Sequence, residues 1–269
     1  MPVLTLTSDF GTKDPDLAVI KAQILQALPE LTLVDISHDL TPFDLEEAFY
    51  VLKNSLFNYP KGSIHMLAID SESYSKNRPI LIKTNRYTFV GNDNGVLPAI
   101  LEEEEYQAYY LDAVPFDSFM KVHLEALVHM EEEAFPTLMT TPADDLKKLK
   151  LPEPELGYEE NRVKYIIPQV IYIDRYGNSI FNLKKKDFEQ WRENRKLNIK
   201  TPVDNITYLS QGYNDLKKSS HGNRRGQYGA RFNAFGYFEI FVNGGNDKAG
   251  GTNILLGLKK NDRVLITFE

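Results

Sequence analysis

The sequence predicts an α/β protein, with a mainly parallel α/β domain followed by a smaller β-barrel domain. In the first half, apolar runs rich in β-branched residues alternate with segments whose apolar residues recur at helical spacing. This alternation favours right-handed crossovers and a mainly parallel sheet. Beyond about residue 140, short alternating strands separated by turn-forming residues are typical of a small β domain. We therefore expect domains at 1–145 and 163–269, joined by a proline- and charge-rich linker at 146–162.

The first predicted element is a strand over 3–7, followed by a helix over 15–28. Asp14 is expected to cap that helix, and Pro15 suits its first position. Asp9 lies between the two elements, at the carboxyl end of the strand, where open α/β sheets place their ligands. A carboxylate there can accept the two hydroxyls of a ribose, although Asp9 could also be only a turn residue.

The same alternation continues with a strand over 31–36, a helix after Thr41 and a strand over 62–69. Thr41 is expected to cap the second helix, with Pro42 at its first position. The third strand ends at Asp70, so a second carboxylate is expected at the carboxyl edge of the sheet. The remaining elements predicted in this domain are strands over 79–84 and 87–90 and a helix over 117–133.

The second domain is predicted to be almost entirely strands and turns. Its turn-forming segments include 174–178 and 243–246, which are rich in Gly, Asn and Asp. The predicted strands cover 163–172, 179–183, 207–209, 237–242 and 263–268.

The composition excludes several classes of protein. A formal net charge of −7 over 269 residues argues against a general nucleic-acid-binding role. The chain has no cysteine, so it can form neither a disulfide nor a thiolate metal site. No apolar run is long enough to span a bilayer, and Met1 leads directly into a strand. We expect a cytoplasmic protein that binds neither nucleic acid nor membrane.

Four ordered segments and the C-terminal tail resemble one known family. The segments read SDFGTKDPDLAVIKAQIL, VDISHDLTPFDLEEAFYVL, VGNDNGVL and IDRYGNSIFNL, and the tail runs from residue 233 to residue 268. Together they are similar to the S-adenosylmethionine (SAM) hydroxide adenosyltransferase family, which is related to chlorinating and fluorinating enzymes that use SAM. The similarity covers most of the chain.

This resemblance implies a homotrimer in which the ligand lies between the first domain of one subunit and the second domain of a neighbour. It assigns the ribose hydroxyls to Asp9, and it assigns the methionine amino group and the adenine to the segment of Asp174 and Asn178. SAM is expected as the substrate, with no further cofactor and no metal. The full set of expected ligand-binding residues is Asp9, Phe10, Asn94, Asp174, Tyr176, Asn178, Asn233, Phe235 and Asn243.

The resemblance further implies hydrolysis of SAM to adenosine and L-methionine, by attack of an activated water on the ribose 5′-carbon. The related hydrolases use an Asp, an Arg and a His. Here Asp70 occupies the first position, Asn77 the second with Arg78 beside it, and Met120 the third with His123 one helical turn away. We therefore expect Asp70, Asn77 and Arg78 to be catalytic, and turnover to be slow.

Three alternatives remain open at this point. The protein could bind SAM or adenosine without turning it over. It could use another nucleophile, such as a halide. The third alternative is a metallohydrolase that uses the strand-end residues Asp9, Asp35, His38 and Asp70.

Overall fold

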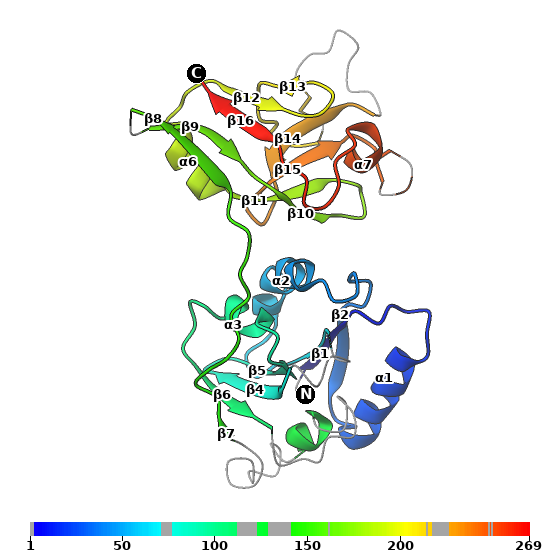
Figure 1. Ribbon diagram of the computed structural model, residues 1–269. Coiled ribbons are helices and arrows are strands. Elements are labelled where there is room, and N and C mark those ends of the chain that lie inside the picture. Colours follow the sequence, from blue (N-terminus) through cyan, green and yellow to red (C-terminus); the bar gives the residue numbers. More distant parts are fainter. Residues whose placement is uncertain are drawn as a thin grey trace. The chain divides into compact units, whose positions relative to one another are not determined.

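The structure is a computed structural model of the 269-residue chain (Figure 1). It describes residues 3–70, 77–111, 123–128, 141–160, 162–213, 215–216, 226–246, 248 and 250–269. The chain divides into two compact units, Met1–Lys150 and Leu151–Glu269.

The first unit is built on a seven-stranded sheet with the order β2-β1-β3-β5-β4-β6-β7 (Figure 1). The strands are β1 Val3–Ser8, β2 Thr32–Ser37, β3 Ile64–Ala68, β4 Pro79–Thr84, β5 Thr88–Asn92, β6 Tyr106–Tyr110 and β7 Thr141–Pro142. Strands β2, β1, β3 and β5 are parallel, and β4, β6 and β7 pair antiparallel with their neighbours. The predicted parallel sheet is thus confirmed for the half that carries Asp9 and Asp70. The antiparallel half adds β6 and β7, which the sequence pattern did not indicate.

Helices cover both faces of this sheet. Met66 and Ala68 of β3 pack in one cluster with residues of α1 and of the described helical segment 123–128. Leu67, between them on the strand, packs in a second cluster with residues of α2 and α3. Because side chains alternate along a strand, these two clusters lie on opposite faces. The helices are α1 Asp16–Ala27, α2 Leu45–Lys53 and α3 Val96–Ile100, with a 3₁₀ turn, η1, at Leu56–Asn58.

The caps of the first two helices differ from the predicted ones. Helix α2 is capped by Asp44, whose carboxylate accepts the Glu47 N–H at 3.0 Å, and not by Thr41. The helix starts later than predicted because Phe43 has a left-handed backbone conformation, φ 65°, which no α-helix continues. Helix α1 follows Pro15 without a side-chain cap, so the predicted cap by Asp14 is wrong. Of the helix predicted over 117–133, only 123–128 lies within the described residues.

The second unit contains two antiparallel sheets, β10-β11-β15-β14 and β13-β12-β16-β9-β8 (Figure 1). Both sheets contribute to one core, in which Phe181 and Phe238 of the first meet Ile199 and Ile266 of the second. The strands are β8 Glu155–Glu159, β9 Arg162–Ile167, β10 Val170–Ile173, β11 Ser179–Lys184, β12 Leu197–Lys200, β13 Asn205–Ile206, β14 Tyr228–Phe232, β15 Tyr237–Val242 and β16 Leu265–Phe268; the helices are α6 Lys185–Arg192 and α7 Thr252–Leu255.

The β character of the second unit is confirmed, but several boundaries are corrected. The strand predicted over 163–172 is two strands in different sheets, β9 and β10, separated by Pro168, which lacks the N–H that a ladder needs. A short strand at 205–206 replaces the one predicted at 207–209. Strand β8 lies within the segment 146–162 that we expected to be a linker. No helix in the described part of the chain is long and apolar enough to cross a membrane.

Candidate active site

Asp9 lies at the carboxyl end of β1 and joins three segments of the first unit. Its Oδ2 accepts the Phe43 N–H at 2.9 Å and the Asp70 N–H at 3.2 Å. Phe43 precedes α2, and Asp70 follows β3, the strand beside β1. None of the described residues donates to the other oxygen, Oδ1, and Asp9 remains 8% exposed. One carboxylate oxygen, Oδ2, therefore holds the backbone of Phe43 and Asp70, and the other, Oδ1, is available to a hydroxyl donor.

Both residues that donate to Asp9 have a backbone conformation that non-glycine residues rarely adopt. Phe43 has φ 65° and Asp70 has φ 50°. Such a conformation costs about 1 kcal/mol or more per residue and persists where surrounding contacts require it. In both residues, the backbone N–H donates a hydrogen bond to the Asp9 carboxylate. The two residues with positive φ and the carboxylate that binds them make this strand edge a candidate functional site.

Asp70 is held in turn by a chain of polar side chains. Its Oδ2 accepts a hydrogen bond from Asn77 Nδ2 at 2.9 Å, and Asn77 Oδ1 accepts one from Lys147 Nζ at 2.7 Å. Asn77 is only 5% exposed, so its amide is shielded between the two charged groups. The structure thus brings Asn77 to Asp70 as predicted, and adds Lys147, which the sequence analysis missed.

Arg78, the neighbouring candidate, lies on an aromatic ring. Its guanidinium carbon is 3.3 Å from the ring centroid of Tyr110, a stacked cation–π arrangement. The Tyr110 hydroxyl oxygen lies 2.9 Å from Asp145 Oδ1 and 3.3 Å from Asp93 Oδ2, so its single proton is shared between two carboxylates. Burial and these two carboxylates raise the pKa of the Tyr110 phenol. Asn77 is therefore the candidate seen bonded to Asp70, and Arg78 forms part of the cluster around Tyr110.

Two further predicted residues lie near this site in supporting positions. Asn94 donates from Nδ2 to the Ile69 carbonyl at 3.1 Å and accepts the Val96 N–H at 3.1 Å, which ties the start of α3 to the residue before Asp70. Phe10 is half-buried and packs against the core cluster that includes α1.

His123, one helical turn from the position of the family's histidine, is buried in the first unit. His123 is fully buried, and its Nε2 lies 2.7 Å from the Gly91 carbonyl oxygen in β5. Met120, which occupies the corresponding family position, lies outside the described residues.

A second polar chain runs beside Asp9. Ser8 Oγ lies 2.7 Å from His38 Nδ1, and His38 Nε2 lies 3.1 Å from Asp35 Oδ1. Burial works to raise the pKa of Asp35, but the hydrogen bonds of Lys21 and His38 outweigh it and the pKa lies below its ordinary value. In the described part of the chain, no group of three or more His, Asp or Glu side chains could hold a metal ion. The metallohydrolase alternative therefore has no ligand cluster among these residues.

In the second unit, Asp174 and Asn178 form one tight turn between β10 and β11. Asp174 Oδ1 accepts the N–H groups of Tyr176 and Asn178, both at 2.9 Å, and Oδ2 accepts Asn178 Nδ2 at 2.8 Å. Asn178 is 1% exposed, and its Oδ1 has no hydrogen-bond partner among the described residues. A buried acceptor normally has a partner, so this oxygen is available to a donor outside the described residues, such as a ligand or an ordered water. Tyr176, at the tip of the turn, is 70% exposed.

Beside this turn lies a buried carboxylate that the sequence analysis missed. Glu239, in the middle of β15, is 2% exposed and pairs with Arg231 at 2.8 Å. The Arg231 guanidinium lies 4.1 Å from the ring centroid of Tyr213, whose hydroxyl is 3.5 Å from Asn178 Nδ2. Burial raises the pKa of Glu239, and Arg231 acts in the opposite direction. Partial burial and the Glu239 carboxylate raise the pKa of Tyr213 to about 12.

The raised pKa of Glu239 predicts a pH-dependent contribution to stability. The unfolded carboxyl titrates near its ordinary value of 4.5 and the folded one at higher pH, so the folded state holds more protons between the two values. The contribution of Glu239 to stability is therefore complete below the unfolded pKa and decreases as the pH rises through the folded pKa. Relative to wild type, Glu239→Gln should gain in free energy of unfolding as the pH rises above 4.5, as measured by denaturant titration. The exposed Glu153→Gln is the control, and an equal pH response of both variants would contradict the assignment.

The other residues predicted to bind ligand are split between the two ends of β15. Asn233 accepts the N–H groups of Phe235 and Tyr237 at 3.0 and 3.1 Å, in the turn before the strand. Asn243 follows the strand, and its N–H donates to the Gln227 carbonyl at 2.7 Å. The strand has six residues, so these ends are roughly 17 Å apart. The turn of Asp174 lies at the Asn243 end, where the Tyr176 carbonyl oxygen approaches Gly245.

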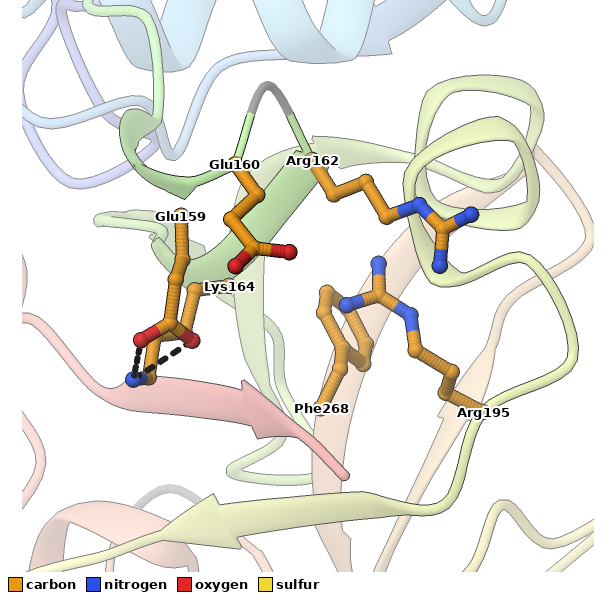
Figure 2. Close-up of a pocket in the computed structure, with 6 residues that line it drawn as sticks. All are labelled: Glu159, Glu160, Arg162, Lys164, Arg195 and Phe268. Carbon is orange, nitrogen blue, oxygen red and sulfur yellow. Dashed lines mark hydrogen bonds and ion pairs between the residues drawn. The ribbon is translucent and has the colours of Figure 1, made fainter.

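A pocket of about 260 Å³ in the second unit contains none of the predicted residues (Figure 2). Its charged groups are largely engaged with one another or with the backbone. Lys164 pairs with Glu159 at 2.7 Å, and the Arg195 guanidinium donates to the carbonyls of Val163 and Trp191. These contacts make the pocket a poor candidate for the active site.

The fold and the strand-end carboxylates define a two-unit α/β protein with a site suited to a hydroxylated small molecule. The family model of the SAM hydroxide adenosyltransferase N-terminal domain matches residues 4–132, and that of the C-terminal domain matches residues 168–265. The chain belongs to the SAM hydroxide adenosyltransferase family, which confirms the resemblance.

Several curated relatives carry names of SAM-dependent enzymes. The (R)-S-adenosyl-L-methionine hydrolase of Thermus thermophilus is 31% identical over 187 residues, covering 65% of this chain and 72% of the relative. The hydrolase of the same name from Methanocaldococcus jannaschii is 28% identical over 200 residues, 70% and 69% of the two chains. A fluorinase of Nocardia brasiliensis is 23% identical over 224 residues, 70% and 73%.

A solved structure supports the fold. An uncharacterized conserved protein from Thermotoga maritima aligns with a TM-score of 0.78 at 20% identity, over 98% of this chain and 99% of the other.

Proposed function

We propose that the protein hydrolyses SAM to adenosine and L-methionine. The oxygen of a water molecule forms a bond to the ribose 5′-carbon as the bond from that carbon to sulfur breaks. The sulfur retains the electron pair and leaves in methionine, and the water releases a proton. Because the sulfonium is already a good leaving group, the protein mainly has to place the water and exclude bulk solvent.

The observation that carries this proposal is that two acids lie at the ends of neighbouring parallel strands. Asp9 follows β1 and Asp70 follows β3, and the Asp9 carboxylate accepts the backbone N–H of Asp70 at 3.2 Å. In this proposal Asp9 accepts ribose hydroxyls through its open oxygen, and Asp70, held by Asn77, orients and activates the water. The shared names of the hydrolase relatives support the same reaction.

The experiment that tests the reaction is incubation of the full chain with SAM, followed by chromatography for adenosine. We expect slow but enzyme-dependent release of adenosine and methionine. Binding of SAM without release would support the binding-protein alternative instead. Release of a halogenated nucleoside, seen only with added chloride or fluoride, would support the halide alternative that the fluorinase relatives suggest.

We further propose a cytoplasmic homotrimer in which the second unit of a neighbouring subunit completes the site. The orphaned acceptor of Asn178 supports a ligand role for that unit. Sedimentation is expected to show a trimer, and a stable monomer that binds adenosine tightly would contradict the shared site.

A further inference from the structure

We propose that Lys147 is a positioning residue that supplies positive charge to Asp70 through the side-chain amide of Asn77. This inference rests on the proposed function, because it assigns the group that keeps the catalytic carboxylate oriented. Lys147 lies in the segment between the two family matches, 133–167, so the family relationship does not assign it a role.

Two hydrogen bonds connect Lys147 to Asp70 through Asn77, and we call this chain of three side chains the relay. The Lys147 ammonium donates to Asn77 Oδ1 at 2.7 Å, and Asn77 Nδ2 donates to Asp70 Oδ2 at 2.9 Å. A cation at the oxygen end of an amide polarises it, which makes the N–H at the other end a stronger donor. Asn77 is 5% exposed and Lys147 is exposed, so water screens the amide less than it screens the ammonium. The carboxylate oxygen that accepts from Asn77 is therefore held in one orientation.

Lys147 is also fixed at its backbone. Its N–H donates to Asp93 Oδ1 at 2.9 Å, and Asp93 is 4% exposed. The Tyr110 hydroxyl bonds both Asp93 and Asp145, which secures the chain two residues before Lys147. A lysine with its backbone fixed in this way loses less entropy when its ammonium meets Asn77 than a lysine on a free loop.

A glycine allows the same segment to lie against the turn after β5. Gly95 has φ 92°, and a Cβ built on it would lie 2.6 Å from the Leu149 backbone nitrogen. Leu146 and Leu149 pack against the core cluster that contains α2 and α3. The segment 145–149 is thus held by apolar packing, by a close backbone approach and by hydrogen bonds, all of which place Lys147 beside Asn77.

The kinetic test compares Lys147→Gln, Lys147→Arg and Lys148→Gln with wild type, using SAM as substrate. Lys148 is the matched control, since it is the next residue, is exposed like Lys147, and its replacement removes the same charge. Loss of the charge-assisted bond should lower kcat roughly five- to ten-fold in Lys147→Gln, with KM nearly unchanged. Lys147→Arg should restore most of kcat, and Lys148→Gln should match wild type.

A second measurement needs no substrate. Nitrogen-15 NMR of the full chain follows the side-chain amide of Asn77, assigned by its absence in Asn77→Ser. This amide signal should shift in Lys147→Gln and stay in place in Lys148→Gln. An Asn77 amide signal that is unchanged in both lysine variants would overturn the relay, whatever the enzyme does with SAM. If wild type releases no adenosine but the NMR shift occurs, the proposed function fails and the relay stands.

Discussion

Replacement of Asp70 by Asn is expected to lower the rate of adenosine release from SAM by roughly 10²–10⁴-fold, the usual contribution of a positioned general base. The substitution preserves the shape of the side chain. The new amide oxygen can still accept the hydrogen bond that Asn77 Nδ2 donates to Asp70 Oδ2 at 2.9 Å in the wild type. The N–H of residue 70 can also still bond Asp9. The fold and the ligand affinity should therefore survive while the reacting carboxylate is lost. Single-turnover assays with excess enzyme give the required sensitivity.

The matched control for this variant is Asp14→Asn. Asp14 is exposed and forms no helix cap, so its loss changes the charge equally without touching the site. Adenosine release at the same rate from Asp70→Asn and wild type would remove Asp70 from the mechanism. In that case the carboxylate would serve only to hold the turn after β3.

Replacement of Asp9 by Ala is expected to weaken adenosine binding about ten- to a hundred-fold, equivalent to roughly 1–3 kcal/mol. The ribose hydroxyls would lose their acceptor. The N–H groups of Phe43 and Asp70 would also lose theirs, so two strained backbone positions would lose the contact that holds them. We therefore expect a lower Tm together with the weaker binding. Calorimetry with adenosine and thermal unfolding measure the two effects.

The variant Asp9→Asn separates these two roles. An asparagine keeps one carbonyl oxygen for the backbone donors but places an amide where the second carboxylate oxygen was. It should retain most of the thermal stability and still bind adenosine less tightly than wild type. Unchanged adenosine affinity in both variants would show that Asp9 only forms the turn.

The sequence predicted the strand-end carboxylates well because their signal is local. A run of apolar or β-branched residues that stops at an acid marks the end of a strand, and this pattern placed Asp9 and Asp70 at strand ends. That these two strands are neighbours comes from the structure. The predicted cap of α2 at Thr41 failed because the left-handed turn at Phe43 depends on the bond from its N–H to Asp9, a contact 34 residues away in the chain.

The role of Lys147 could not be predicted for the same physical reason. Its partner Asn77 is 70 residues away, and the segment around it has the composition of a charged linker. Only two leucines, Leu146 and Leu149, anchor the segment to the core, which is too few to create a recognisable period. Likewise, strand β15 is buried at every position, so it lacks the alternation of buried and exposed residues that distinguishes the two faces of a strand. The sequence pattern therefore could not show that the Glu239 carboxylate is buried.

The most direct test of the central claim is hydrolysis of SAM in water enriched with oxygen-18, with mass spectrometry of the adenosine. Attack of water on the ribose 5′-carbon predicts one oxygen-18 atom in the 5′-hydroxyl of adenosine and none in methionine. The label should appear at a much lower rate with Asp70→Asn. Adenosine without the label, or a nucleoside that retains sulfur, would contradict the proposed reaction.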